Sequence, residues 1–251
     1  HRVEKPEHHE SGRDIRLTYP TNHPDMKSIN LTLSKPFDRV APCGSRFWGN
    51  PDLPKGYGYP SYPDEDGDPF EYQFVCQINL AEVAPYDTGN RLPHKGLLSF
   101  FAKIDHYLGR FDGGSTIGGY IGDTDDVKVL FFPEVGLPGD NPGFKELILL
   151  DEDDKPLNPE ELQIRFTTEP GEIYRDDHAL FAEPTHREWA TWDSPYEAWQ
   201  ILLQVDSFSG MDFNLNFMDC GVLDFLISPD DLAAGRFDRV RAIVLSTSHI
   251  S

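Results

Sequence analysis

Seven residues stand within or beside short apolar runs and carry groups that could line a binding or reaction site. They are Arg46, Trp48, Gln77, Asn79, Gln204, Asp206 and Asp219. Two carboxylates with different pKa values could do acid–base work, and Asp206 with Asp219 is the pair that the sequence nominates. A buried amide without hydrogen-bond partners costs roughly 1–3 kcal/mol. We therefore expect Gln77 and Gln204 to hold neighbouring backbone, with a ligand between two halves of the fold as the alternative.

Three tryptophans, Trp189, Trp192 and Trp199, lie close together just before an apolar run that starts at Ile201. Large aromatic rings can stack on a sugar or base, or anchor a protein partner. The alternative is that they cover the core. Trp189 and Trp192 are accordingly predicted as candidate contact residues, together with the seven above.

Motifs for nucleophilic or phosphate chemistry fail at their decisive positions. Residues 43–48 are similar to the sequence around a papain-type nucleophile, but Arg46 stands where the second cysteine belongs. The glycine-rich residues 113–120 contain no lysine and run into carboxylates, which would repel phosphate. No catalytic residue and no cofactor is therefore predicted.

Metal sites are not predicted either. The acidic runs 64–68 and 151–154 lack the glycine and glutamate that an EF-hand loop requires at its sixth and twelfth positions. The histidines at 94, 106, 178 and 186 show no pairing four residues apart. We interpret both acidic runs as solvated loops.

Charge and composition narrow the class of partner. The 251 residues hold 43 carboxylates against 22 Lys and Arg, a net charge of −21. Nucleic acid and anionic membranes require a positive surface, so neither is an expected partner. The negative charge would attract basic proteins or cations, and the alternative is that it serves solubility alone. No apolar run is long enough to span a membrane. Three widely spaced cysteines favour a reducing cytoplasm.

Two segments of the chain repeat one pattern. Residues 74–79 are followed by a glycine-led run at 96–101, and residues 201–206 by a similar run at 221–226. The two copies are offset by 127 and 125 positions. The repeats near 74–101 and 201–226 predict one β unit used twice, with the two copies covering each other.

The remaining pattern predicts a mainly β fold, bordering on α+β, with a roll-like or barrel-like core of two related halves and a few short helices. Further strands are expected at 127–132, 147–150, 163–167 and 240–245. Helix-start patterns occur at residues 158–161, 194–197 and 228–231. Residues 1–30 are polar and predict an N-terminal arm, and residues 31–251 a single globular domain.

The motifs at residues 45–54, 76–80, 92–101, 202–207, 218–227 and 231–240 resemble the YwqG-like family, a bacterial domain of unknown function. The resemblance implies a mainly β, roll-like fold with a duplicated core, and it implies no reaction. The chain has Trp48 where the family pattern has glycine, and residues 185–189 lack the family's double glycine.

Three functions agree with these features. The first is a cytoplasmic, non-enzymatic protein of the inhibitor or immunity type, which uses its acidic surface to bind a basic protein. The second is an enzyme or small-molecule receptor with its site between the two halves. The third is a structural subunit that forms oligomers through an apolar face.

Overall fold

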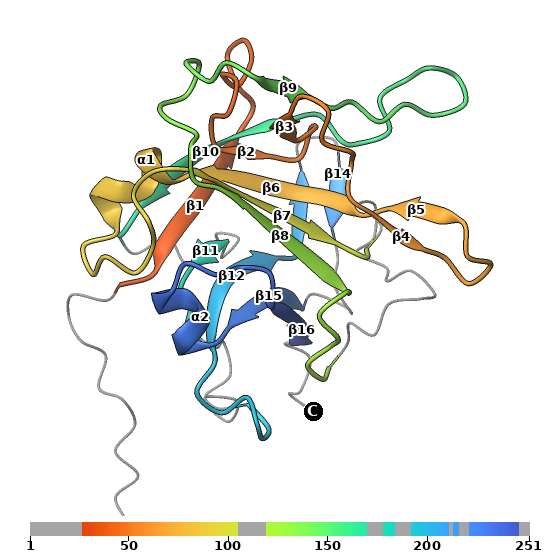
Figure 1. The fold of residues 1–251 in the computed structure, drawn as a ribbon. Helices are drawn as coiled ribbons and strands as arrows, with labels where there is room; N and C mark the ends of the chain where they lie inside the picture. Colours follow the sequence, from red (N-terminus) through yellow and green to blue (C-terminus); the bar gives the residue numbers. More distant parts are fainter. Residues whose placement is uncertain are drawn as a thin grey trace, which may run out of the picture.

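The computed structural model describes residues 27–104, 119–169, 178–183, 192–210, 213–215 and 221–245. Most of these residues belong to or cover one ten-stranded antiparallel sheet (Figure 1). Its strands, in sheet order, are β16 (Arg241–Leu245), β15 (Val222–Ile227), β12 (Gln200–Asp206), β11 (Ala179–Leu180), β1 (Ile29–Ser34), β10 (Leu162–Thr167), β2 (Arg46–Phe47), β6 (Gln73–Asn79), β7 (Leu97–Ala102) and β8 (Val127–Phe132).

Smaller elements surround this sheet. Three strand pairs are β3 (Asp52–Pro54) with β9 (Phe144–Glu146), β4 (Ser61–Pro63) with β5 (Pro69–Glu71), and β13 (Phe208–Gly210) with β14 (Phe213–Leu215). The helices are α1 (Leu80–Val83), a 3₁₀ turn (Ala84–Tyr86) and α2 (Pro229–Ala233). The prediction of a mainly β protein with a few short helices is confirmed. None of the described helices is long and apolar enough to cross a membrane.

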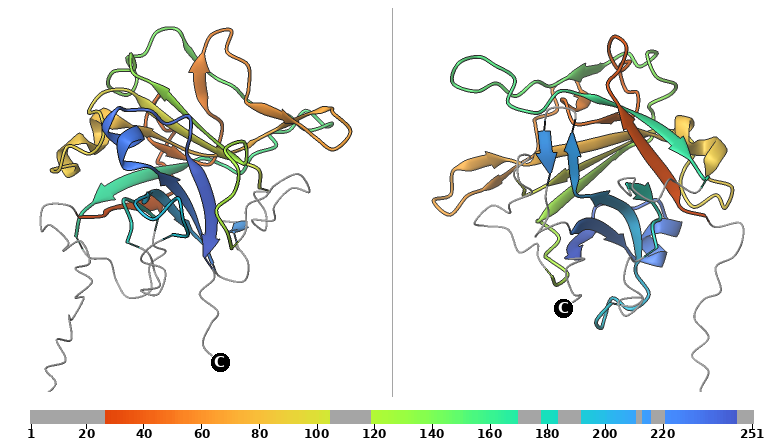
Figure 2. Two further views of the ribbon diagram at one scale, coloured as in Figure 1. Left: turned by 60° about the horizontal axis from the view of Figure 1, so that its bottom comes forward. Right: turned by 180° about the vertical axis from the view of Figure 1, so that it is seen from behind.

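The sheet curls until its two outer strands approach each other, which gives the barrel-like shape seen in the two views of Figure 2. The amide of Gly122, just before β8, donates to the carbonyl of Ala242 on β16 over 2.9 Å. Inside the curl, the rings of Phe131 on β8 and Phe237 after α2 pack edge to face, 5.3 Å apart.

The fold consists of two halves with the same strand order, β2-β6-β7-β8 and β11-β12-β15-β16. In the first half the β6–β7 register shifts between Phe74 and Cys76, and in the second the β12–β15 register shifts between Ile201 and Leu203. These positions correspond in the sequence repeat. The repeated segments therefore have the same backbone irregularity as well as the same strands, which confirms the two related halves.

The turn after the short strand of each half is also repeated. Trp48 follows β2 with a φ of 54°, and Phe181 follows β11 with a φ of 52°. The Trp48 amide donates to Val75 (2.9 Å) and the Phe181 amide to Leu202 (3.1 Å). Because a positive φ favours glycine, Trp48 and Phe181 hold the same backbone conformation at a cost that a glycine would avoid.

The first strand of each half has changed places with its counterpart. β1 precedes β2 in the chain but pairs with β11, through Asn30 opposite Ala179. β10 precedes β11 but pairs with β2, through Gln163 opposite Arg46. β1 and β10 then pair with each other along their length. Each half is thus completed by a strand that comes from the other half of the chain.

The two halves share one apolar core. Phe100 lies opposite Cys76 in the first half and Phe225 lies opposite Leu203 in the second, so the two rings occupy equivalent positions. They contact each other edge to face, with centroids 5.2 Å apart. The surrounding cluster contains buried residues from both halves. The expected packing of one copy against the other is therefore present.

Three local expectations differ from the structure. Residues 158–161 form no helix, because Asn158 exchanges side-chain hydrogen bonds with Asn50 and Gln73 (3.3 Å each). Residues 194–197 form a turn. Residues 147–150 lie outside the strands, in one arm of a hairpin that closes with Leu157 donating to Leu149 (2.9 Å).

The N-terminal arm, predicted for residues 1–30, lies mostly outside the described residues, since these begin at residue 27. Strand β1 starts at Ile29.

Candidate functional site

In the first half, the polar candidates form one buried network. Arg46 is 1% exposed and donates to the Asp52 carboxylate (2.9 Å) and to the Asn50 carbonyl (2.7 Å). Its Nε lies 2.9 Å from Glu161. Two carboxylates therefore neutralise one guanidinium that the sheet keeps away from water.

The Gln77 amide lies at the centre of this network. It donates to Asp52 (2.8 Å) and to the Gly44 carbonyl (2.9 Å), and its oxygen accepts from the Asp52 amide (3.0 Å). Asn79 donates to the carbonyls of Cys43 and Gly136 and caps α1 by accepting from Ala81. Gln77 thus fastens the segment before β2 and the start of β3 to the sheet, which is the structural role expected for it, and Asn79 fastens the same segment before β2.

Two further candidates lie in packed surroundings. Trp48 is fully buried in the shared core and stacks edge to face on Phe47, 5.0 Å away. Trp192 is 5% exposed and donates from Nε1 to the Trp199 carbonyl (2.9 Å). Trp192 covers the outer face of β15 and β16. Asp219 and Trp189 lie outside the described residues.

In the second half, four polar side chains occupy the positions that Ser45, Gln77, Asn79 and Ser99 hold in the first half. The amide of Asn79 donates to Ser45 Oγ (2.9 Å), and the amide of Asp206 donates to His178 Nδ1 (3.0 Å). Gln77 lies opposite Ser99, and Gln204 opposite Asp224. The corresponding pairs are Ser45 and His178, Asn79 and Asp206, Gln77 and Gln204, and Ser99 and Asp224.

The two sets differ in their capacity to exchange protons. The first-half set has no residue that titrates in the ordinary pH range, whereas the second-half set contains two carboxyl groups and an imidazole. We call His178, Gln204, Asp206 and Asp224 the acid cluster. Since Gln204, Asp206 and Asp224 alternate with core residues on paired strands, they share the outer face of the sheet.

Asp224 is the most unusual member of the acid cluster. It is fully buried, and neither carboxyl oxygen has a hydrogen-bond partner. Burial raises its pKa well above the usual range, and the charge of Asp206 raises it further. Asp224 is therefore a neutral acid under conditions in which most carboxyl groups are ionised.

His178 is also held neutral. Burial lowers its pKa to about 4. Its Nδ1 accepts a hydrogen bond from the Asp206 amide, which places the ring proton on Nε2. The sequence nominated Asp206 as one of a carboxylate pair, and the structure places it beside Asp224. Reasoning from sequence missed Asp224 and His178, although a charged residue inside the apolar run 222–227 was a visible signal.

The two thiols that the structure describes show no sign of reactivity. Cys43 and Cys76 are free and buried. Burial raises the pKa of Cys43 to about 12, and burial also raises the pKa of Cys76. Because the thiolate is the reactive form, neither is a nucleophile at neutral pH. Among the described residues there is no group of three potential metal ligands.

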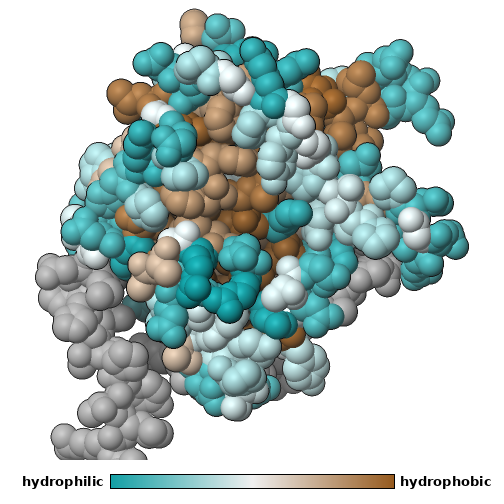
Figure 3. Space-filling model, viewed as in Figure 1, coloured by the Kyte–Doolittle hydropathy of each residue, from teal (hydrophilic) through white to brown (hydrophobic). Residues whose placement is uncertain are grey.

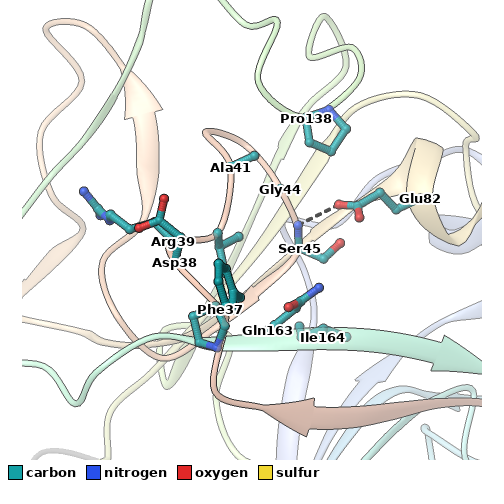
Figure 4. A pocket seen from close by; sticks show the side chains of 12 residues that line it. Phe37, Asp38, Arg39, Ala41, Gly44, Ser45, Glu82, Pro138, Gln163 and Ile164 are labelled. Carbon is teal, nitrogen blue, oxygen red and sulfur yellow. Dashed lines mark hydrogen bonds between the residues drawn. The ribbon is translucent and has the colours of Figure 1, made fainter.

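Two surface hollows flank the segment that connects β1 to β2. The first has a volume of about 330 Å³ and lies between Phe37, Glu82, Pro138 and Gln163 (Figure 4). Glu82 is held at its rim by the Ser45 amide (2.8 Å). The second, of about 390 Å³, has four carboxylates and two cationic side chains in its lining: Asp38, Glu146, Glu160, Glu161, Lys35 and Arg39.

Two acidic turns extend from the molecule with the same geometry. In the turn between β4 and β5, Asp64 Oδ1 accepts from the amides of Asp66 and Asp68 (2.9 Å each). In the hairpin of residues 149–157, Asp151 Oδ1 accepts from the amides of Asp153 (2.8 Å) and Lys155 (3.0 Å). Only the first carboxylate of each turn is used internally, which leaves the others facing solvent.

These turns, which we call the acidic tips, project toward the same side of the molecule in Figure 1 and in the right view of Figure 2. Exposed apolar side chains lie beside them: Phe70, Ile148, Leu150 and Leu157, each 47–52% exposed. In Figure 3 the upper right projection has a hydrophilic tip and a hydrophobic base. The second hollow adjoins this base at Pro156.

A family model with the description "Domain of unknown function (DUF1963)" matches this chain over residues 45–186 and 177–244. No curated protein matches the chain. The two matched segments run from just before β2 to the end of β16 and so include both halves of the sheet. The chain belongs to the DUF1963 family.

Proposed function

We propose that this protein is a cytoplasmic, non-enzymatic binding protein that recognises a basic protein partner, in the manner of an inhibitor or immunity protein. The observation that carries the proposal is the pairing of two acidic tips with exposed apolar side chains on one side of the molecule. The family assigns no activity, and the resemblance to YwqG-like proteins stays a prediction that implies no reaction.

Charge supports this proposal. A net charge of −21 attracts a basic protein over several ångströms and accelerates encounter, and the effect weakens as salt is added. The acidic tips concentrate part of that charge, and among the described residues none of their carboxylates forms an ion pair. The exposed apolar residues at their bases then offer contact area that a charged rim alone would lack.

The second hollow extends the proposed surface. Arg39 bridges Glu146 (2.5 Å) and Glu161 (3.6 Å) at this hollow and is itself 62% exposed. An arginine or lysine of a partner can compete with this exposed arginine for the same carboxylates. The free, buried thiols agree with a reducing compartment.

The test uses a defined probe, a synthetic 12-residue peptide in which arginine and leucine alternate, with an alternating glutamate–leucine peptide as its control. Calorimetry measures the affinity of the native protein for each. The variant that neutralises both tips carries Glu65→Gln, Asp66→Asn, Glu152→Gln and Asp153→Asn. Four exposed charges at about 0.3–0.5 kcal/mol each predict about tenfold weaker binding of the cationic peptide.

A matched variant removes four exposed carboxylates elsewhere, through Asp193→Asn, Glu197→Gln, Asp230→Asn and Asp238→Asn. It has the same net charge as the tip variant. If the tips are the binding surface, this control keeps an affinity within about threefold of the native protein. Equal losses in the two variants would show unspecific attraction by net charge and would refute the proposed surface.

A further inference from the structure

The acid cluster contains a buried carboxyl group without any donor. Both oxygens of Asp224 are inaccessible to water and without hydrogen bonds, although burial without partners costs free energy. The equivalent residue in the first half is Ser99, a small neutral side chain. The fold therefore does not require an acid at this position.

The first half shows which group would complement such a position. There, the guanidinium of Arg46 lies beside Gln77 on the neighbouring strand and pairs with buried carboxylates. In the second half the residue opposite Gln204 is Ala179. The second half therefore has an alanine at the position of Arg46 and a buried acid at the position of Ser99.

Within the part of the chain that the structure describes, the charged groups around Asp224 do not supply that cation. From β12, Asp206 adds negative charge, and His178 is neutral. From β16, Arg241 donates to the Gly122 carbonyl (2.9 Å), and its guanidinium lies over the Tyr196 ring at 5.2 Å. The head group of Arg241 is therefore held away from the carboxyl group of Asp224.

We propose that the acid cluster is a second binding site, which takes the guanidinium or ammonium group of a small ligand at the place that corresponds to Arg46 in the first half. Asp224 supplies the charge partner, and the side chains of Gln204 and Asp206 on the same face supply further acceptors. Asp206 is partly exposed, so it connects the buried acid to solvent. Trp192 covers the neighbouring apolar part of this face.

Binding at this site exchanges one proton for one cation. Asp224 holds its proton in the free protein, because burial and Asp206 raise its pKa. An incoming cation favours the carboxylate, so the proton leaves to solvent and the net charge of the site is conserved. The apparent affinity therefore rises about tenfold per pH unit as long as the free protein keeps Asp224 protonated.

The experiment titrates the full chain with methylguanidinium and, as a neutral molecule of nearly the same shape, methylurea. Backbone amide shifts by NMR report binding at residues 204–206 and 222–226. We expect methylguanidinium to bind, with an affinity that rises with pH, and methylurea to bind at least about tenfold more weakly. No methylguanidinium shifts at these residues, or equal affinities for the two probes, would overturn the proposal.

Two variants separate a binding role from a structural one. Asp224→Asn keeps the shape of the side chain but cannot carry charge, and we expect at least about tenfold weaker methylguanidinium binding without pH dependence. Ser99→Ala changes the equivalent position of the first half and should leave binding unchanged. The tip variant described above should also retain it, so failure of one proposal leaves the other intact. Native affinity in Asp224→Asn would contradict the assignment.

Discussion

At the scale of single residues, Arg46 illustrates how strongly the stability of the protein depends on one buried charge. Its guanidinium is the counterion of Asp52 and Glu161. Arg46→Met would leave both carboxylates without that cation, and we expect it to lower the free energy of unfolding by about 3–5 kcal/mol. Urea unfolding measures the change.

Arg39→Met is the matched control, because Arg39 also pairs with Glu161 but is 62% exposed. Exposed ion pairs contribute little, so we expect a loss within about 1 kcal/mol. Similar losses for the two substitutions would contradict the view that burial makes the Arg46 network important.

His178 predicts a pH dependence of stability. Its pKa falls from 6.5 to about 4 on folding, so the unfolded chain binds more protons between these values. The stabilisation is complete above pH 6.5 and is lost as pH falls toward 4, by at most about 3 kcal/mol. His178→Asn retains an acceptor for the Asp206 amide and should remove this dependence.

The measurement is the free energy of unfolding of the native protein and of His178→Asn at several pH values, and the difference between the two is compared across pH. Asp224 titrates in the opposite sense, since a raised pKa favours the folded state at low pH and loses that effect as pH rises. Asp224 is present in both proteins, so the difference between their free energies of unfolding reports on His178 alone. A difference that does not change between pH 6.5 and 4 would contradict the assignment.

At the scale of elements, sequence identified the strands that repeat and also β10, and it missed β1, β2 and β11. The runs that became β6, β7, β12 and β15 are apolar and long enough to stand out. β1 alternates buried and half-buried residues but lies next to a polar segment, and β2 and β11 have two residues each. Local patterns also carry no information about partners, so the exchange of β1 and β10 could not be predicted.

The limits of local sequence patterns also explain which residues of the site could be predicted. Sequence grouped Gln77 and Asn79 with Gln204 and Asp206 by repetition, and the structure shows that each pair occupies equivalent positions. The sequence alone could not show that Asp224 lies opposite Gln204, because that pairing depends on the register of β12 and β15. Helix-start patterns succeeded at Ser228, which caps α2, and failed at Asn158, whose side chain makes long-range hydrogen bonds instead.

The exchange of first strands predicts that Leu31 and Ile164 contribute equally to the free energy of unfolding. They occupy equivalent places on β1 and β10 and are 2% and 5% exposed. We expect Leu31→Ala and Ile164→Ala each to cost about 2–4 kcal/mol in urea unfolding. Leu137→Ala, at a side chain 67% exposed, should stay within about 0.5 kcal/mol. A small effect at either buried position would contradict the central role of this strand pair.

At the scale of the whole molecule, the exchanged strands and shared core make the halves interdependent. Neither half has a complete set of strands without the other. We therefore expect β7 and β15 to lose protection from amide hydrogen exchange at the same denaturant concentration, measured by mass spectrometry. Loss of protection in one strand well before the other would mean that the halves fold separately.

The divergence of the two halves is the central claim, since one half keeps a closed structural network and the other carries the acid cluster. The most direct test is carbon-13 NMR of the aspartate carboxyl groups, with the Asp224 signal identified by its loss in Asp224→Asn. We predict a protonated Asp224 signal at neutral pH that moves to the carboxylate position when methylguanidinium is added. An ionised Asp224 in the free protein, or a signal that methylguanidinium leaves unchanged, would contradict this account.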